Sequence, residues 1–321
     1  GADMTSEFSL TPTNMVGRVR NIIRNYQTPI RALAQEPVQN AKDAARGDVV
    51  VEYQLHTQCP YDGQNAYTLT ITDSNTIGLR GRPLSLAQIQ EQGGVLHPDE
   101  RWARFEGMDY ANPDEDALGS RGQGKAAFLY HSRLPSASFP GEERMMILYD
   151  TLLEDGEYRL GVRYASPLDT VLRQPFYNDA AREIITSAYR AKDGTTIPLA
   201  LEPLTKVGTR VIVPHLSDEA VGAFRSGELY QWLQRCWWRA VQTGLIIELI
   251  DEQGKRERVV APAWWEGEPW KERVKPEGLR LYSDIDVGDG LRIKRIVLRH
   301  DESIARVESE FWGVQLLRGQ Q

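Results

Sequence analysis

Apolar residues recur at helical spacing in several stretches of the chain. The first strong pattern follows Thr28 and Pro29, a capping residue and a proline in the first helical turn. It predicts a helix that runs to about Arg46 and stops at Gly47, since glycine commonly terminates helices. We expect further helices at residues 84–92, 125–131 and 217–240.

Strand patterns lie between and after these helices, where Val, Ile, Tyr and Thr are frequent. We expect strands at residues 48–57, 66–72, 144–151, 157–164, 208–214, 244–251, 279–286 and 291–300. Residues 93–124 show little periodicity, and a loop of that length is usually functional or mobile. Strands interspersed with helices and hairpin-length turns favour an α+β sandwich over a doubly wound sheet.

Composition and charge narrow the class of protein. The 321 residues carry a net charge of −7, so the chain has no bulk attraction to nucleic acid. Two cysteines, Cys59 and Cys236, fit neither a disulfide framework nor a zinc cluster, which favours a reducing, cytoplasmic location. No apolar run approaches the roughly 18 to 20 residues that span a bilayer, so we expect no membrane association. The best candidates for a local basic patch are Lys271, Lys275, Arg292, Lys294 and Arg295.

Four short motifs carry candidate chemistry, and the first lies on the helix after Pro29. Glu36, Asn40 and Asp43 fall within about 60° of one another around a helix. Such a face presents carboxylate, amide and carboxylate groups that polarise a water or ligate a hard cation. The alternative interpretation is the solvated face of an amphipathic helix.

The other three motifs are rich in glycine. A predicted strand ends at Asp73, and the following turn contains Asn75 and Gly78. A loop containing Gly119, Arg121, Gly122 and Gly124 precedes a predicted helix that begins near Lys125, which is an arrangement that binds anions. The last motif is Gly208 and Thr209 at the start of a strand.

Taken together and in this order, the motifs resemble those of the GHKL ATPases, the superfamily of gyrase, heat-shock chaperones, histidine kinases and MutL. The resemblance covers about residues 29–214 and implies a Bergerat fold, a two-layer α/β sandwich with a mixed, largely antiparallel sheet. It also implies binding of ATP with Mg²⁺, slow hydrolysis, and a homodimer in the ATP-bound state.

The resemblance assigns a role to each matching residue. Glu36 would be the general base that orients the attacking water, and Asn40 would ligate Mg²⁺. Asp73 would accept a hydrogen bond from the adenine amino group, and Asp43 and Thr209 would help to hold the adenine end. The phosphates would lie in the glycine loop of Gly119, Gly122 and Gly124, with residues 93–124 as the lid. From its position alone, Lys125 could touch a phosphate.

Two residues depart from the family pattern. Asn75 stands where the first glycine of the adenine turn is usual, and Gly78 comes one residue late; asparagine tolerates the left-handed conformation that such a turn needs. Pro37 directly follows the proposed base, and should kink the helix or mark its true start.

A P-loop is the competing interpretation of the glycine loop. Gly119, Gly124 and Lys125 have its spacing, but Ala126 stands where a hydroxyl should bind Mg²⁺. An acidic loop, rather than a buried strand, also precedes the motif.

These observations predict an ATP-binding domain over residues 4–254 and a strand-rich region over residues 255–321, the start of a transducer-type domain. The ATPase would be a switch acting on DNA, on client proteins or in defence, through a protein or DNA partner. The alternative is a module that senses nucleotide without hydrolysis or binds protein or DNA. Outside the motifs, we expect His56 and His215 at strand ends and a solvated Arg210.

Overall fold

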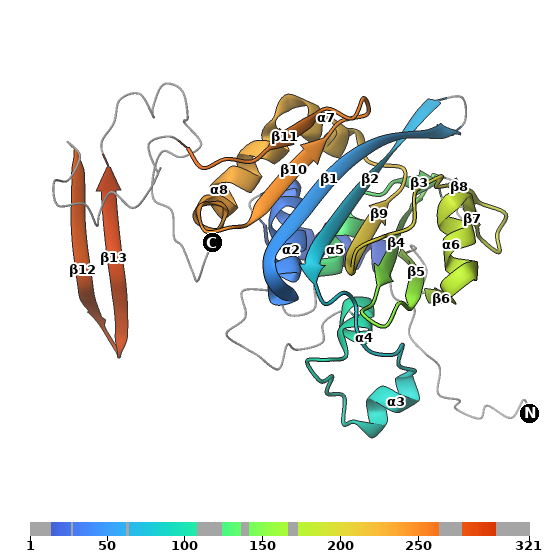
Figure 1. Cartoon of the computed structure of the whole chain (residues 1–321), viewed down its shortest axis with the longest axis horizontal. Helices are drawn as coiled ribbons and strands as arrows, with labels where there is room; N and C mark the ends of the chain where they lie inside the picture. The colour runs from blue at the N-terminus through green and yellow to red at the C-terminus, as the bar shows by residue number, and fades with distance from the viewer. Residues whose placement is uncertain are drawn as a thin grey trace, which may run out of the picture.

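The computed structural model describes residues 14–26, 28–61, 64–107, 124–135, 141–165, 173–262 and 278–299. These residues form a mixed α+β protein around a nine-stranded sheet (Figure 1). The strands of this sheet are β1 (Ala45–Tyr61), β2 (Gln64–Thr76), β3 (Leu134–Pro135), β4 (Glu143–Leu152), β5 (Tyr158–Ala165), β6 (Arg173–Tyr177), β9 (Gly208–Val213), β10 (Ile246–Ile250) and β11 (Arg256–Arg258). Two smaller sheets pair β7 (Ala188–Arg190) with β8 (Thr196–Pro198), and β12 (Leu279–Gly288) with β13 (Leu291–Arg299).

The large sheet is mixed and mostly antiparallel, as the resemblance implies. Its order is β11-β10-β1-β2-β9-β4-β5-β6, with β3 paired to β4. β1 and β10 run parallel, whereas the other described pairs of this sheet are antiparallel. β9, which is distant in sequence, therefore lies directly between β2 and β4.

Helices cover one face of the sheet along most of its width (Figure 1). This layer consists of α1 (Met15–Ile23), α2 (Pro29–Asp43), α5 (Gly124–Leu129), α7 (Asp218–Ser226) and α8 (Glu228–Gln242). The opposite face carries α6 (Asn178–Thr186) beside β5 (Figure 1). Two short helices, α3 (Leu86–Glu91) and α4 (Arg101–Glu106), follow β2 in the chain. No helix in the described ranges is both long and apolar enough to cross a membrane.

Both faces of the large sheet are buried where β4 lies. Met145, Ile147 and Tyr149 join the core under α1, α2, α5 and α8. Met146 and Leu148 join a second core with residues of α6, β7 and β8. The two-layer expectation is therefore too simple here, because a third layer covers β4, β5 and β9.

Pro37 lies inside α2, and the helix continues through it from Pro29 to Asp43. Pro37 thus does not mark the start of the helix. A proline has no N–H, so the carbonyl of Leu33, four residues earlier, loses its helical donor. The buried hydroxyl of Tyr53 in β1 donates to that carbonyl at 2.9 Å. Trp237 of α8 donates its Nε1–H to the adjacent Ala34 carbonyl at 3.0 Å.

Two predicted helices differ in their bounds from the structure, and α4 was not predicted. α2 ends at Asp43 rather than Arg46, because Ala45 already pairs with Thr76 in the sheet. The single helix predicted over residues 217–240 is two helices, α7 and α8, separated by Gly227 with φ of 86°. α4 lies within the segment predicted to be a loop, since its six residues are too short to show a helical period.

Tyr53 gives a direct test of how the proline is accommodated. We expect Tyr53→Phe to lower the free energy of unfolding by about 1–3 kcal/mol, because a buried carbonyl loses its donor. In a Pro37→Ala background residue 37 regains an N–H, so the same substitution should cost distinctly less. Urea unfolding of the four proteins measures this coupling. Tyr177→Phe, at an exposed tyrosine, should change stability by less than about 0.5 kcal/mol; equal losses for Tyr53→Phe in both backgrounds would contradict the explanation.

Candidate functional site

Asp73 and Thr209 meet where the end of β2 pairs with the start of β9. The antiparallel register pairs Thr72 with Arg210, which places Asp73 opposite Thr209. The backbone N–H of Thr209 donates to Asp73 Oδ1 at 3.1 Å, and the hydroxyl of Thr76 donates to the same oxygen. Because both donors contact Oδ1, the second carboxylate oxygen receives neither bond.

Burial raises the pKa of Asp73 from its ordinary value to about 6. The hydrogen bonds from Thr76 and Thr209 and the positive charge of Arg101 act in the opposite direction, and limit the rise. The carboxylate is therefore mainly ionised at pH 7, but at a free-energy cost. A buried acceptor that is kept charged at such a cost is typical of functional sites.

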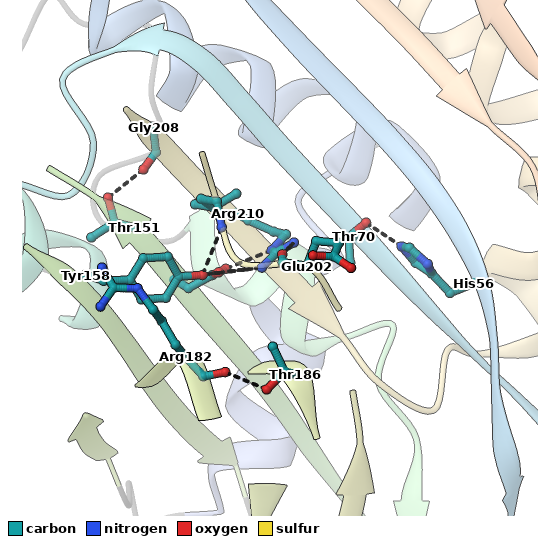
Figure 2. A network of polar contacts seen from close by, with 11 residues as sticks. His56, Thr70, Thr151, Tyr158, Arg182, Thr186, Glu202, Gly208 and Arg210 are labelled. Carbon is teal, nitrogen blue, oxygen red and sulfur yellow. Dashed lines mark hydrogen bonds and ion pairs between the residues drawn. The ribbon is translucent and has the colours of Figure 1, made fainter. Parts of the chain in front are cut away.

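Gly208 and Gly78 are required by close contacts around Asp73. A Cβ on Gly208 would lie 2.1 Å from the backbone oxygen of Asp73. Gly78 has φ of +72°, and its Cβ would lie 2.6 Å from Thr151 Oγ1. The Thr151 hydroxyl donates to the Gly208 carbonyl at 2.6 Å (Figure 2) and accepts from the N–H of Leu79 at 2.9 Å. The second and fourth motifs therefore form one packed unit.

Asn75 takes the left-handed conformation that its position in the turn requires, with φ of 59°. Its side-chain Nδ2 donates to the carbonyl of Asp48 at 2.8 Å. The turn after Asp73 thus forms without the usual first glycine. It also contacts the end of α2, because the N–H of Ile77 donates to the Ala44 carbonyl at 2.9 Å.

The polar face of α2 is not uniformly solvated. Glu36 is only 2% exposed and accepts a hydrogen bond from the hydroxyl of Tyr26. Asn40 is half-buried and Asp43 is exposed. The solvated-face interpretation therefore fails for Glu36, which is a buried carboxylate, whereas Asp43 is the most exposed of the three residues.

Arg101 connects the end of α2 to the neighbourhood of Asp73. Its guanidinium donates to the backbone carbonyl of Asp43 at 2.7 Å. Desolvation has the largest effect on the carboxyl groups of Asp43 and Asp73, and it raises the pKa of each above its ordinary value. The positive charge of Arg101 acts in the opposite direction on both groups. Asp43 also accepts a hydrogen bond from Gln39 at 2.9 Å. The sequence motifs did not identify Arg101, because it lies in a segment without periodicity.

Lys125 is buried beside the carboxyl end of α4. It is 3% exposed, and its ammonium donates to the carbonyls of Phe105, Glu106 and Gly107. These carbonyls lie at the carboxyl end of α4, where unpaired helix carbonyls favour a cation. The ammonium of Lys125 therefore caps α4, and its contact with a phosphate stays a prediction.

Part of the third motif lies outside the described residues. This applies to Gly119, Arg121 and Gly122, and to Lys271 and Lys275 of the expected basic patch. Gly124 is the first residue of α5. Of the expected lid, residues 93–107 are described; Leu96 and Ala103 pack with Leu84 and Ile89 in a small separate core.

Arg210 is buried, not solvated as expected, and it fixes β9 beside β4 (Figure 2). Its guanidinium binds both oxygens of Asp150, with N···O distances of 3.0 and 2.6 Å, and Tyr158 donates to the same carboxylate. It also donates to the carbonyl of Glu202 at 3.0 Å. This network anchors the strand whose first residues contact Asp73.

His56 lies within β1 and not at a strand end. Its ring pairs with Thr70 at 2.8 Å (Figure 2). Burial, aided by the nearby charge of Arg210, lowers the pKa of His56 to about 4. The ring is therefore neutral at pH 7. His215 follows the end of β9, as expected.

No group of three or more His, Cys, Asp or Glu residues suited to a metal occurs among the described residues. A search of protein-family models found no match for this chain, and neither did a search of curated proteins.

The close contact at Gly208 predicts that alanine substitutions at Gly208 and at Gly222 change the stability very differently. Gly208→Ala should destabilise the protein by roughly 2 kcal/mol or more, because a methyl group cannot fit against the Asp73 backbone. Gly222, in α7, has no heavy atom within 4 Å of an added Cβ, so Gly222→Ala should be neutral or stabilising. Urea unfolding of both variants checks this, and equal stability of the two would show that β9 and β2 are not in close contact.

Asp73 should reduce stability at neutral pH. Since its pKa is raised in the folded state, ionisation opposes folding, and the cost is present above about pH 6 and absent below about pH 4. Asp73→Asn should therefore stabilise the protein by on the order of 1–3 kcal/mol at pH 8, with the gain fading toward pH 4. Urea unfolding across this range measures the difference. For the exposed Glu219→Gln little variation with pH is expected, and a pH-independent effect of Asp73→Asn would contradict the argument.

Proposed function

We propose that this chain binds ATP with Mg²⁺ and hydrolyses it slowly, as a GHKL-type ATPase that works as a conformational switch. The observation that carries the proposal is the contact between motifs that are far apart in sequence. Asp73 and Thr209, 136 residues apart, share a hydrogen bond, and the turn after Asp73 touches the end of α2. The helix that carries Glu36 and Asn40 therefore ends against the turn that follows the carboxylate proposed for adenine.

The arrangement of layers supports the same proposal. A mixed, mostly antiparallel sheet is covered on one face by α1, α2, α5 and α8, which suits a Bergerat-type fold. α6 and the β7–β8 pair would then be additions to the opposite face. A P-loop fold is disfavoured, because α5 follows no parallel strand of the described sheet.

The base of the nucleotide would lie against Asp73. The carboxylate is held by Thr76 and Thr209 through Oδ1, which leaves Oδ2 to accept from the exocyclic amine of adenine. Asp43 and Thr209 would complete this end of the site. Guanine presents a carbonyl oxygen at that position, so the ionised carboxylate would repel it and favour adenine.

Asn40 suits Mg²⁺ as a protein ligand. Its side-chain amide is half-buried on the α2 face that also carries Glu36. Mg²⁺ is commonly held by one or two protein oxygens together with substrate phosphates and waters, so no cluster of carboxylates is needed. When bound, the ion would neutralise phosphate charge. The glycine loop of Gly119, Gly122 and Gly124 stays the predicted phosphate contact.

Glu36 would act as the general base. It is a buried carboxylate whose orientation is fixed by the Tyr26 hydroxyl. It would take a proton from water as the water oxygen forms a bond to the γ-phosphorus and the bond to the ADP oxygen breaks. Such a base contributes typically 10²–10⁴-fold to a rate.

Binding and hydrolysis can be separated with two variants. We expect magnesium-dependent ATP binding by calorimetry, weakened at least tenfold in Asp73→Asn through loss of the acceptor. Glu36→Ala should keep the affinity for ATP and lose about 10²–10⁴-fold in hydrolysis, measured by phosphate release.

The control for these variants is Asp193→Asn, which removes a carboxylate paired with Arg144 at a distance from the motifs. It should leave binding and hydrolysis near wild-type values. ATP binding without any hydrolysis would favour a nucleotide sensor over an ATPase. No binding by wild type would refute the nucleotide site itself.

A further inference from the structure

Tyr26 belongs to none of the motifs discussed above, yet its hydroxyl is in direct contact with the proposed base. It follows α1 and precedes the α2 cap, and its hydroxyl donates to Glu36 Oε1. Glu36 is 2% exposed, so few other positions are open to its side chain. We propose that Tyr26 is a positioning residue that fixes the rotamer of Glu36 for proton transfer, an inference that rests on the proposed ATPase function.

The segment that carries Tyr26 is held at both ends. The N–H of Tyr26 donates to the Ile23 carbonyl at 3.0 Å, which ties it to the end of α1. On the other side, Thr28 caps α2 by accepting from the N–H of Arg31 at 3.1 Å. The Tyr26 ring also packs against the main core. The hydroxyl therefore has a fixed position relative to α2.

The rotamer of Glu36 matters because its backbone position is already set. Pro37 follows it directly, and α2 is tied at the preceding turn to Tyr53 and Trp237. With the backbone fixed, only side-chain rotation can misplace the carboxylate. A hydrogen bond to one oxygen removes that freedom and leaves a base pre-organised for its water.

Tyr26→Phe removes only the hydroxyl and should therefore affect catalysis more than binding. We expect kcat for ATP hydrolysis to fall roughly tenfold or more, because a small misplacement of a reacting group is costly. KM and the calorimetric Kd for ATP should stay within about twofold. A merely structural role for Tyr26 would instead change stability and affinity together, or change nothing in kcat.

A double-mutant cycle with Glu36→Gln tests whether Tyr26 acts through Glu36. Glu36→Gln keeps the shape but loses the base, so adding Tyr26→Phe should cause no further loss in single-turnover hydrolysis. The matched control is Tyr164→Phe, which removes a hydroxyl that pairs with Tyr189 in the second core. Its kcat should equal that of wild type, and circular dichroism should confirm that all variants are folded.

The possible failures are distinguishable. If wild type hydrolyses ATP, Glu36→Gln does not, and Tyr26→Phe matches wild type, the inference about Tyr26 is overturned while the ATPase stands. An additional loss in the double variant would also overturn it, since Tyr26 would then act elsewhere. Absence of hydrolysis by wild type overturns both the ATPase and the role of Tyr26.

Discussion

The proline inside α2 is the constraint on which the arrangement of this protein depends. Pro37 leaves the Leu33 carbonyl without its helical donor in the middle of a packed layer. A buried unpaired carbonyl is costly, so the chain supplies a replacement from another element, the Tyr53 hydroxyl of β1. Trp237 of α8 binds the neighbouring carbonyl. The interrupted turn of α2 is therefore the point where α2 is hydrogen-bonded to both the sheet, through β1, and the packed helix α8.

Asp73 is a second polar group whose desolvation is partly compensated by donors from other residues. Its carboxylate is desolvated between β2 and β9, and the surrounding donors only partly offset that cost. The strand beside it is held independently, by the buried pair of Arg210 and Asp150 on the other side of β9. A fully hydrogen-bonded pair of this kind adds specificity of placement more than stability. The desolvated carboxylate of Asp73 therefore lies at one edge of β9, and the ion pair that anchors β9 lies at its other edge.

Sequence patterns predicted the elements of this fold better than their contacts. Composition identified β1, β2, β4 and β9, because runs rich in Val, Ile, Tyr and Thr between turn residues are typical of strands. The contact between Gly208 and Asp73 left no such trace, since either residue alone is an ordinary turn or strand residue. Only the order of the motifs, through a resemblance, brought them together. α4 and the third layer over β4 were missed because short helices and fully buried strands carry little periodicity.

Charged side chains were the hardest to place, for a physical reason. The sequence gives the charge but not the desolvation or the partner, and these decide where a charged group lies. Lys125 follows a glycine loop, yet its ammonium caps α4. Glu36 lies on the polar side of an amphipathic helix, yet it is buried, whereas Asp43 on the same side is exposed. A polar face on a helix wheel thus contains two kinds of position, and tertiary contacts such as that of Tyr26 distinguish them. For this reason the buried carboxylate of Glu36, rather than the whole polar face of α2, is the group proposed to act as a base.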